Sequence, residues 1–268
     1  IVPFYLIVAA SFMTESEIIT RGFSFWPKEL SMGAYELVFR VPKTIIQAYG
    51  VSTFVTAAGT ALGLFFTTMM AYVLSRTTCR YRDKMSFFIY FTTLFSGGMI
   101  PTYLVVSKLH LIDTFWAMVI PSAMGVWNVI LTKTYIQSSI PLEIYESASI
   151  DGCTDWKYFT GMVLPLSKPI IAVMVLLYAV GKWNDFFSGL LYLNDSSRQP
   201  LQMILRNILV MSDSVGINMN LAEQMNRQEL KTLLQYSLIV VSSVPVLLLY
   251  PLIQKHFVKG IMMGAVKG

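Results

Sequence analysis

Long apolar segments separated by short polar loops dominate the pattern of this chain. An uncharged segment that can cross about 30 Å of hydrocarbon is predicted to form a membrane-spanning helix. Four segments meet this test directly: residues 51–74, 86–107, 114–132 and 233–253. A fifth, 170–192, is apolar except for a polar group at Lys182–Asp185. The pattern therefore predicts an all-α membrane protein.

The first apolar segment, residues 1–12, is too short to cross a bilayer as a helix. We expect it to be the outer part of a first span whose beginning is missing. The predicted architecture is then six transmembrane helices, the first incomplete, forming a single transmembrane domain over residues 1–268.

Composition agrees with a membrane location. Hydrophobic residues make up 55% of the chain and charged residues 13%, and the mean hydropathy is +0.60. Soluble domains carry about 25% charged residues. A soluble globular class is therefore excluded.

Basic residues in the short loops indicate the orientation, because cytoplasmic loops carry an excess of Lys and Arg. The basic positions are Arg76, Arg80, Arg82 and Lys84 in the loop 75–85, and Lys255, Lys259 and Lys267 after the last span. With six spans, this arrangement predicts that both ends of the chain and the loop around Glu146 are cytoplasmic, and that 193–232 is an extracytoplasmic loop. The net charge of +5 then reflects topology, and no basic, aromatic-interleaved patch indicates nucleic acid.

Motifs for enzyme chemistry are absent from the sequence. His110 and His256 are isolated, so no zinc-protease spacing occurs, and there is no Gly-x-Ser-x-Gly nucleophile motif. A phosphate-binding Gly-x-x-x-x-Gly-Lys loop is missing too. We expect no catalytic residues, no metal site and no cofactor in this chain.

The polar loop at 141–152 has the marks of a short helix. Pro141 suits a first helical turn, Glu143 and Glu146 lie near the positive end of the helix dipole, and Gly152 can adopt the left-handed conformation that ends a helix. One face of this helix would carry Leu142, Tyr145, Ala148 and Ser149, and could enter a shallow cleft on another protein. The same face could also lie on lipid.

The spacing around this helix resembles the coupling loop of permease subunits of bacterial ABC importers. Glu146-Ser147-Ala148 is followed by Gly152 and then, after nine intervening residues, by Met162-Val163-Leu164-Pro165. Ser147 and Met162 stand where the family usually has Ala and Ile. The resemblance implies a cytoplasmic coupling helix at 141–152 that docks on an ATPase through the following residues: Glu143, Tyr145, Glu146, Ser147, Ala148, Asp151, Gly152, Leu164 and Pro165.

The polar group in the fifth segment is the second candidate site. Ionisable residues at membrane depth are costly and often functional. Lys182 and Asp185 would pair on one helix, Trp183 could stack on a sugar ring, and Asn184 could bind hydroxyls. These residues are predicted to line the substrate path. Alternatively the span covers 163–181, and the group is an interfacial belt with a snorkelling lysine.

Asn128, in the fourth predicted span, is a weaker candidate for the substrate path. A single Asn at this depth more often forms a hydrogen bond to a neighbouring helix.

Other segments resemble carbohydrate permeases, in the group of the smaller permease of the maltose importer. They are Trp183-Asn184-Asp185-Phe186-Phe187, Leu190-Leu191-Tyr192, Phe257-Val258-Lys259-Gly260 and Gly264-Ala265-Val266-Lys267-Gly268. Within that group, the chain looks most similar to permeases for acidic oligosaccharides such as those of alginate. Lys182 and Arg206 are candidate partners for a uronate.

The resemblance implies a type I ABC importer fold in the bacterial inner membrane. The expected partners are a second, homologous permease, two ATPase subunits that bind ATP and Mg, an extracytoplasmic solute-binding protein and membrane lipid. Import of oligosaccharides by alternating access is the implied function. The alternative is a secondary transporter or channel without an ATPase, which would need ion-coupling carboxylates that the spans lack apart from Asp185.

Overall fold

Helices are the regular secondary structure in the part of the chain that the computed structural model describes. That part comprises residues 2–14, 17–18, 20, 22, 24–28, 30–33, 35–36, 42–214, 235–248 and 251. The predicted tail at 257–268 and the second half of the predicted loop 193–232 lie outside it.

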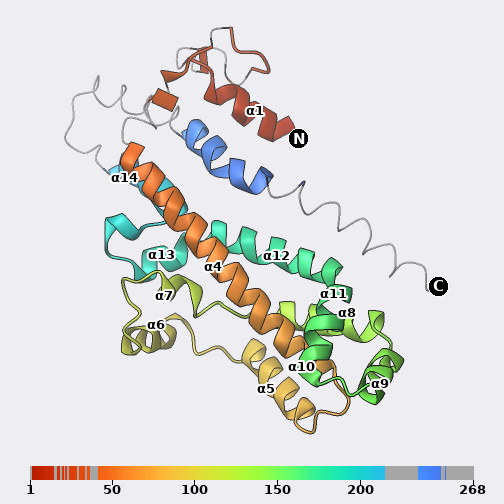
Figure 1. The fold of residues 1–268 in the computed structure, drawn as a ribbon. Helices are drawn as coiled ribbons and strands as arrows, with labels where there is room; N and C mark the ends of the chain where they lie inside the picture. The colour runs from red at the N-terminus through yellow and green to blue at the C-terminus, as the bar shows by residue number, and fades with distance from the viewer. Residues whose placement is uncertain are drawn as a thin grey trace. The chain divides into compact units, whose positions relative to one another are not determined.

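The helices follow one another in the order shown in Figure 1. Their bounds are α1 Val2–Ser11, α4 Pro42–Ser75, α5 Arg82–Leu94, α6 Met99–Lys108, α7 Trp116–Val119, α8 Val126–Ser139, α9 Leu142–Ile150, α10 Asp155–Tyr158, α11 Leu164–Leu166, α12 Lys168–Trp183, α13 Phe187–Tyr192 and α14 Leu201–Ser214. A π-helix, η1, spans Phe159–Val163, and a 3₁₀ helix, η2, spans Ser196–Arg198. Another apolar helix covers Gln235–Leu248.

The chain divides into two compact units. The first consists of Ile1–Thr53 with Asn184–Leu248, and the second of Phe54–Trp183 with Leu249–Gly268. Most of the predicted site residues belong to the second unit, and Asn184 and Asp185 belong to the first.

The predicted spans are only partly continuous helices. In α4, residues Ile45–Ser75 are long and apolar enough to cross a membrane alone. The predicted span 86–107 is instead α5 and α6, bent by 117°, and Asp155–Leu166 is bent by 80° against Lys168–Trp183. If each bent pair is one span, the described residues contain up to three spanning segments by length and composition.

Two further predicted spans are each divided into two helices. The segment 114–132 is divided into α7 and α8 by the non-helical residues 120–125, and 170–192 is divided into α12 and α13. Single continuous helices were therefore the wrong prediction for these segments.

Local residues explain the position of two breaks. Gly98 precedes α6 with φ +84°, a conformation that side-chain-bearing residues rarely adopt. Near the second break, Pro165 and Pro169 lack the backbone N–H that would continue the helical hydrogen bonds through residues 163–169. Apolar composition favours a helix on both sides, and these residues interrupt it.

The core of the second unit lies where α4 ends. Its buried residues come from α4, α5, α8, α9, α10 and η1, with Ile140 directly after α8, and are Ala71, Tyr72, Leu74, Ile89, Val129, Ile136, Ile140, Ala148, Tyr158, Phe159 and Val163. Figure 1 shows these helices gathered around the end of α4. This core supports the predicted coupling loop.

Side-chain contacts to backbone amides order part of the first unit. The Ser52 hydroxyl accepts a hydrogen bond from the Leu201 amide, 2.8 Å away. At η2, the Ser197 amide donates to the Asp195 carboxylate at 2.8 Å and lowers the pKa of that carboxyl. The first half of the predicted loop 193–232 is therefore an ordered turn followed by α14.

Candidate functional site

The helix predicted at 141–152 is present as α9, Leu142–Ile150. Pro141 occupies the position before the first helical residue, with φ −60° and ψ 148°, so it precedes the helix instead of starting it. Glu143 lies in the first turn, and the Asp151 amide donates to the carbonyls of Ser147 and Ser149. The two ends of this helix agree with the prediction to within two residues.

Gly152 ends α9 in the predicted conformation, with φ +73°. Its amide donates to the Ser149 carbonyl at 3.1 Å, and the Cys153 amide donates to the Ala148 carbonyl at 2.9 Å. These bonds satisfy carbonyls that the helix end would otherwise leave unpaired. A Cβ atom at Gly152 would meet nothing within 4 Å, so backbone conformation alone favours glycine here.

The face of α9 that carries Ala148 points into the protein. Ala148 is only 3% exposed, and Ile144 and Tyr145 are half-buried against the same core. The prediction that this face is free to enter a partner was wrong for Ala148, whereas Leu142 and Ser149 of the same face are exposed. Because a small side chain is needed where α9 meets the core, Ala148 positions the helix and does not offer contact surface in this structure.

The outward face of α9 and its neighbour α10 carries a mixed surface. Exposed along it are Glu143, Glu146, Ser147 and Asp151 among the predicted docking residues. Two apolar side chains were missed by the sequence analysis: Ile150 is 87% exposed and Trp156 is 59% exposed. Acidic groups around exposed apolar side chains form a surface that can bind another protein through a small buried contact.

Arg76 connects α9 to the end of α4. Its guanidinium carbon lies 3.2 Å from the centre of the Tyr145 ring, and 5.8 Å from the centres of the Tyr72 and Tyr158 rings. Tyr145 and Tyr158 pack edge to face, with ring centres 5.2 Å apart. A cation over an aromatic face is held by the ring quadrupole, so these four residues form a contact between the spanning helix and α9.

A cavity of about 280 Å³ lies beside this contact and is lined by Arg76, Gln137, Leu142 and Tyr145, among others. The sequence analysis used Arg76 only as a marker of orientation. One sequence signal could have indicated this contact: Arg76 directly follows an apolar segment and lies four residues after Tyr72.

The remaining predicted docking residues lie on α11. Leu164 is half-buried against the core, and Pro165 is exposed. Both follow the π-helix η1 and precede the 80° bend at Ser167. The structure therefore connects the core beneath α9, through η1, with the start of α12.

Lys182, the first substrate-path candidate, is buried near the end of α12 with 7% exposure. Its ammonium donates to the Met118 carbonyl at 2.6 Å and to the Ser122 hydroxyl. Met118 belongs to α7, whose last carbonyls have no helical partner, and a cation is stabilised there. Lys182 thus stabilises the interrupted segment between α7 and α8.

The same side of α12 packs against glycines of α4. A Cβ at Gly59 would lie 2.9 Å from the Lys182 side chain, and a Cβ at Gly63 would lie 2.9 Å from the Tyr178 ring. The Tyr178 hydroxyl interacts with the Thr67 hydroxyl at 2.6 Å and accepts from the Gly125 amide at 3.0 Å. The Lys182 ammonium and the Tyr178 hydroxyl therefore reach residues 118–125. They can do so because Gly59 and Gly63 of α4 leave room for the two side chains.

The other substrate-path candidates differ in exposure. Trp183 is 5% exposed, so its ring face is not open for stacking on a sugar in this structure. Asn184 is exposed, and its side-chain oxygen accepts from Gln202 at 3.4 Å. Asp185 is half-buried and caps α13 by accepting from the Ser188 amide. Asp185 lies beyond the end of α12, so the predicted pairing of Lys182 and Asp185 along one helix was wrong.

Asn128 lies half-buried in the first turn of α8. A Cβ at Gly125 would lie 3.3 Å from its amide nitrogen, so Asn128 covers the glycine at the break before α8. Its predicted place in the substrate path remains a prediction.

Comparisons with known proteins identify what this arrangement is similar to. Residues 6–262 match the family model described as the binding-protein-dependent transport system inner membrane component. Protein LplC of Bacillus subtilis is 46% identical over all of this chain and 90% of its own length. The polygalacturonan/rhamnogalacturonan transport system permease protein YtcP of the same organism is 43% identical, over all of this chain and 93% of its own.

A solved structure is also similar. It is a bacterial ABC transporter involved in the import of the acidic polysaccharide alginate, with a TM-score of 0.82 and 30% identity. The match covers 95% of this chain and 90% of the solved chain. Because nearly the whole chain superimposes, the likeness supports the predicted type I importer fold.

Proposed function

Because the chain belongs to the family of inner membrane components of binding-protein-dependent transport systems, and is a permease subunit of a carbohydrate ABC importer, we propose that it imports acidic oligosaccharides. It is a multi-pass transport subunit of the inner membrane and not an enzyme. This membership disfavours the alternative of a secondary transporter or channel.

The likeness to YtcP carries the proposal on substrate. That relative is named for polygalacturonan and rhamnogalacturonan, and the solved structure for alginate. Polygalacturonan and alginate are both polymers of uronic acids, so their fragments share a ring carboxylate. The similarity in sequence to YtcP and the similarity in structure to the alginate importer thus favour one chemical class of substrate, the uronate oligosaccharides.

The proposed coupling places an ATPase subunit on the outward face of α9 and α10. Ile150 and Trp156 would supply the apolar contact, with Glu143 and Glu146 at its border. Arg76 would pass a displacement of α9 to α4, because its guanidinium stacks directly on Tyr145. ATP and Mg are bound by two ATPase subunits, and a second permease completes the pathway.

Alternating access then follows as a rigid-body change. Closure of the two ATPase subunits would move α9 together with the aromatic core, since Ala148, Tyr158 and Phe159 are buried in one cluster. The loop 75–85 and both ends of the chain are cytoplasmic in this scheme. A solute-binding protein would deliver the sugar on the opposite side.

ATP hydrolysis by the reconstituted complex tests the proposal. The complex is placed in lipid nanodiscs with its binding protein and with oligomers of galacturonate, mannuronate or guluronate, or with neutral maltooligosaccharides. Stimulation by uronate oligomers above the neutral sugars is expected. Stimulation by neutral sugars alone would overturn the substrate class and leave the importer intact, whereas no ATPase activity with any sugar would contradict the coupling.

A further inference from the structure

A groove of about 430 Å³ lies between the end of α4 and the start of α5, away from the coupling surface. It is lined by Met70, Tyr81, Lys84, Met85, Phe88 and Ile89. All these side chains are apolar or aromatic except for Lys84. An open apolar groove with one cation at its edge fits a molecule that has a hydrocarbon chain and an anionic group.

We propose that this groove binds an anionic phospholipid, with an acyl chain along Met70, Met85 and Phe88 and the phosphate against Lys84. The position in the span supports this occupant. Met70 lies five residues before the end of the spanning helix at Ser75, which corresponds to about 7.5 Å of helix. The groove therefore begins in the hydrocarbon region and reaches the headgroup level.

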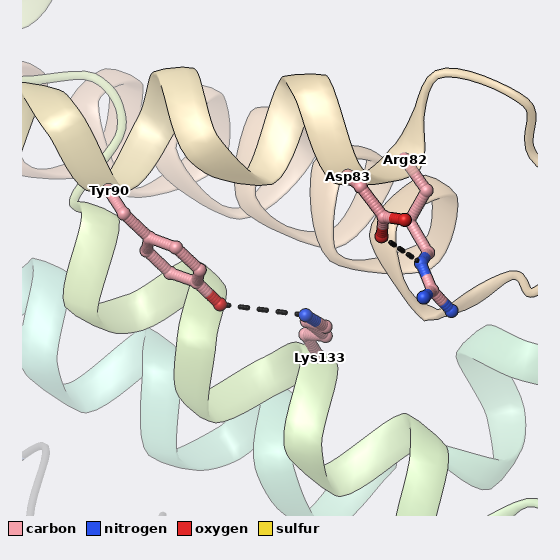
Figure 2. Close-up of polar contacts among 4 residues, drawn as sticks. All are labelled: Arg82, Asp83, Tyr90 and Lys133. Carbon is pink, nitrogen blue, oxygen red and sulfur yellow. Dashed lines mark hydrogen bonds and ion pairs between the residues drawn. The ribbon is translucent and has the colours of Figure 1, made fainter.

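Charge around the groove favours an anionic headgroup over a neutral one. The loop and the first turn of α5 carry Arg76, Arg80, Arg82 and Lys84. Arg82 pairs with Asp83 at 2.9 Å, as Figure 2 shows. Lys84 and Arg80 are both exposed, and neither forms an ion pair among the described residues. Basic clusters at the end of a spanning helix attract anionic lipids.

The side chains beside the groove suit a lipid-facing surface. Phe87 is 71% exposed and Phe88 is 69% exposed on the outward side of α5. Tyr81, which is 60% exposed, lies at the same end, where amphipathic aromatic side chains lie at headgroup level. On the other side of α5, the Tyr90 hydroxyl accepts a long hydrogen bond, 3.5 Å, from the Lys133 ammonium of α8 (Figure 2). The groove face is thus left for lipid.

Photolabelling tests the proposal on the complete complex. The complex is reconstituted with a trace of phosphatidylglycerol or phosphatidylcholine that carries a diazirine in one acyl chain, and labelled residues are mapped by mass spectrometry. Phosphatidylglycerol is expected to label Met85 or Phe88 more strongly than phosphatidylcholine does. Unlabelled phosphatidylglycerol should compete, and equal labelling by both lipids would overturn the proposal.

Matched variants identify the cation. Lys84→Gln should lower phosphatidylglycerol labelling by up to about fivefold, the factor associated with one basic side chain at a membrane surface. Lys108→Gln removes an exposed lysine of α6 that does not line the groove, and should leave labelling unchanged. Unchanged labelling in Lys84→Gln would also count against the site. The ATP hydrolysis assay measures stimulation by sugar and the photolabelling measures lipid binding. The proposed function and the lipid site can therefore fail independently.

Discussion

The polar residues of α9 and those at the end of α12 both interrupt apolar sequence, but the structure uses them in opposite ways. On α9 the charged side chains face outward, and the small residue Ala148 faces the core. At the end of α12, Lys182 and Trp183 are buried. A polar group in an apolar segment therefore indicates an important position, but not whether a partner or the protein itself satisfies it.

Gly152→Val should have the largest effect on transport. It should disturb α9 and leave the end of α12 unchanged. A side-chain-bearing residue in the left-handed conformation costs about 1–2 kcal/mol, so the helix would end incorrectly. We expect sugar-stimulated ATP hydrolysis and uptake to fall by roughly five- to thirtyfold. Gly161→Ala is the control, because its Cβ also meets nothing within 4 Å. Normal uptake in Gly152→Val would contradict the docking role of α9.

Lys182→Met should lower stability and leave sugar preference unchanged. The substitution removes charged hydrogen bonds to Met118 and Ser122 and costs about 1.5–3 kcal/mol. Thermal unfolding of the complex in nanodiscs measures the loss, with Lys108→Met as an exposed control. A changed sugar preference with unaltered thermal stability would instead assign Lys182 to the substrate path.

Arg76→Gln should weaken coupling by an intermediate amount. It removes a cation–aromatic contact worth about 0.5–2 kcal/mol between α4 and α9. Sugar-stimulated ATP hydrolysis should persist while uptake per ATP falls, as measured in proteoliposomes. Tyr145→Phe keeps the ring and should behave as wild type, whereas Tyr145→Leu should reproduce the defect. If the two Tyr145 variants behave alike, the ring is not what connects the helices.

Asn184→Ala should have the smallest effect on stability, within about 0.5 kcal/mol, because the side chain is exposed. If Asn184 lines the substrate path, the KM for uptake should rise while the thermal stability stays constant. Ser196→Ala, at an exposed position of η2, is the control. An unchanged KM would remove Asn184 from the path.

The sequence predicted those features that depend on neighbouring residues. Pro141 and Gly152 mark the ends of α9, and apolar length marks α4, because helix ends and hydrophobic spans are encoded locally. The bends were not predicted, since an apolar segment has the same composition whether its helix continues or breaks. Gly98 and Pro165 were visible signals, but their effect depends on what packs around them.

Long-range contacts were outside the reach of the sequence. The main-chain partner of Lys182 is a carbonyl 64 positions away, and no side-chain pattern indicates a backbone acceptor. The inward direction of Ala148 was missed for a related reason. Helical spacing groups residues on one face, but it does not say whether that face meets the protein's own core or another molecule.

The break between α5 and α6 has a consequence for biogenesis. Residues 95–98 leave the helix within a segment of membrane-spanning length, and all four residues are exposed. Lipid offers no hydrogen bonds to irregular backbone, so this stretch must be covered by another subunit or by a water-filled cavity. If another subunit supplies this cover, we expect the newly inserted chain to be incomplete until that subunit binds.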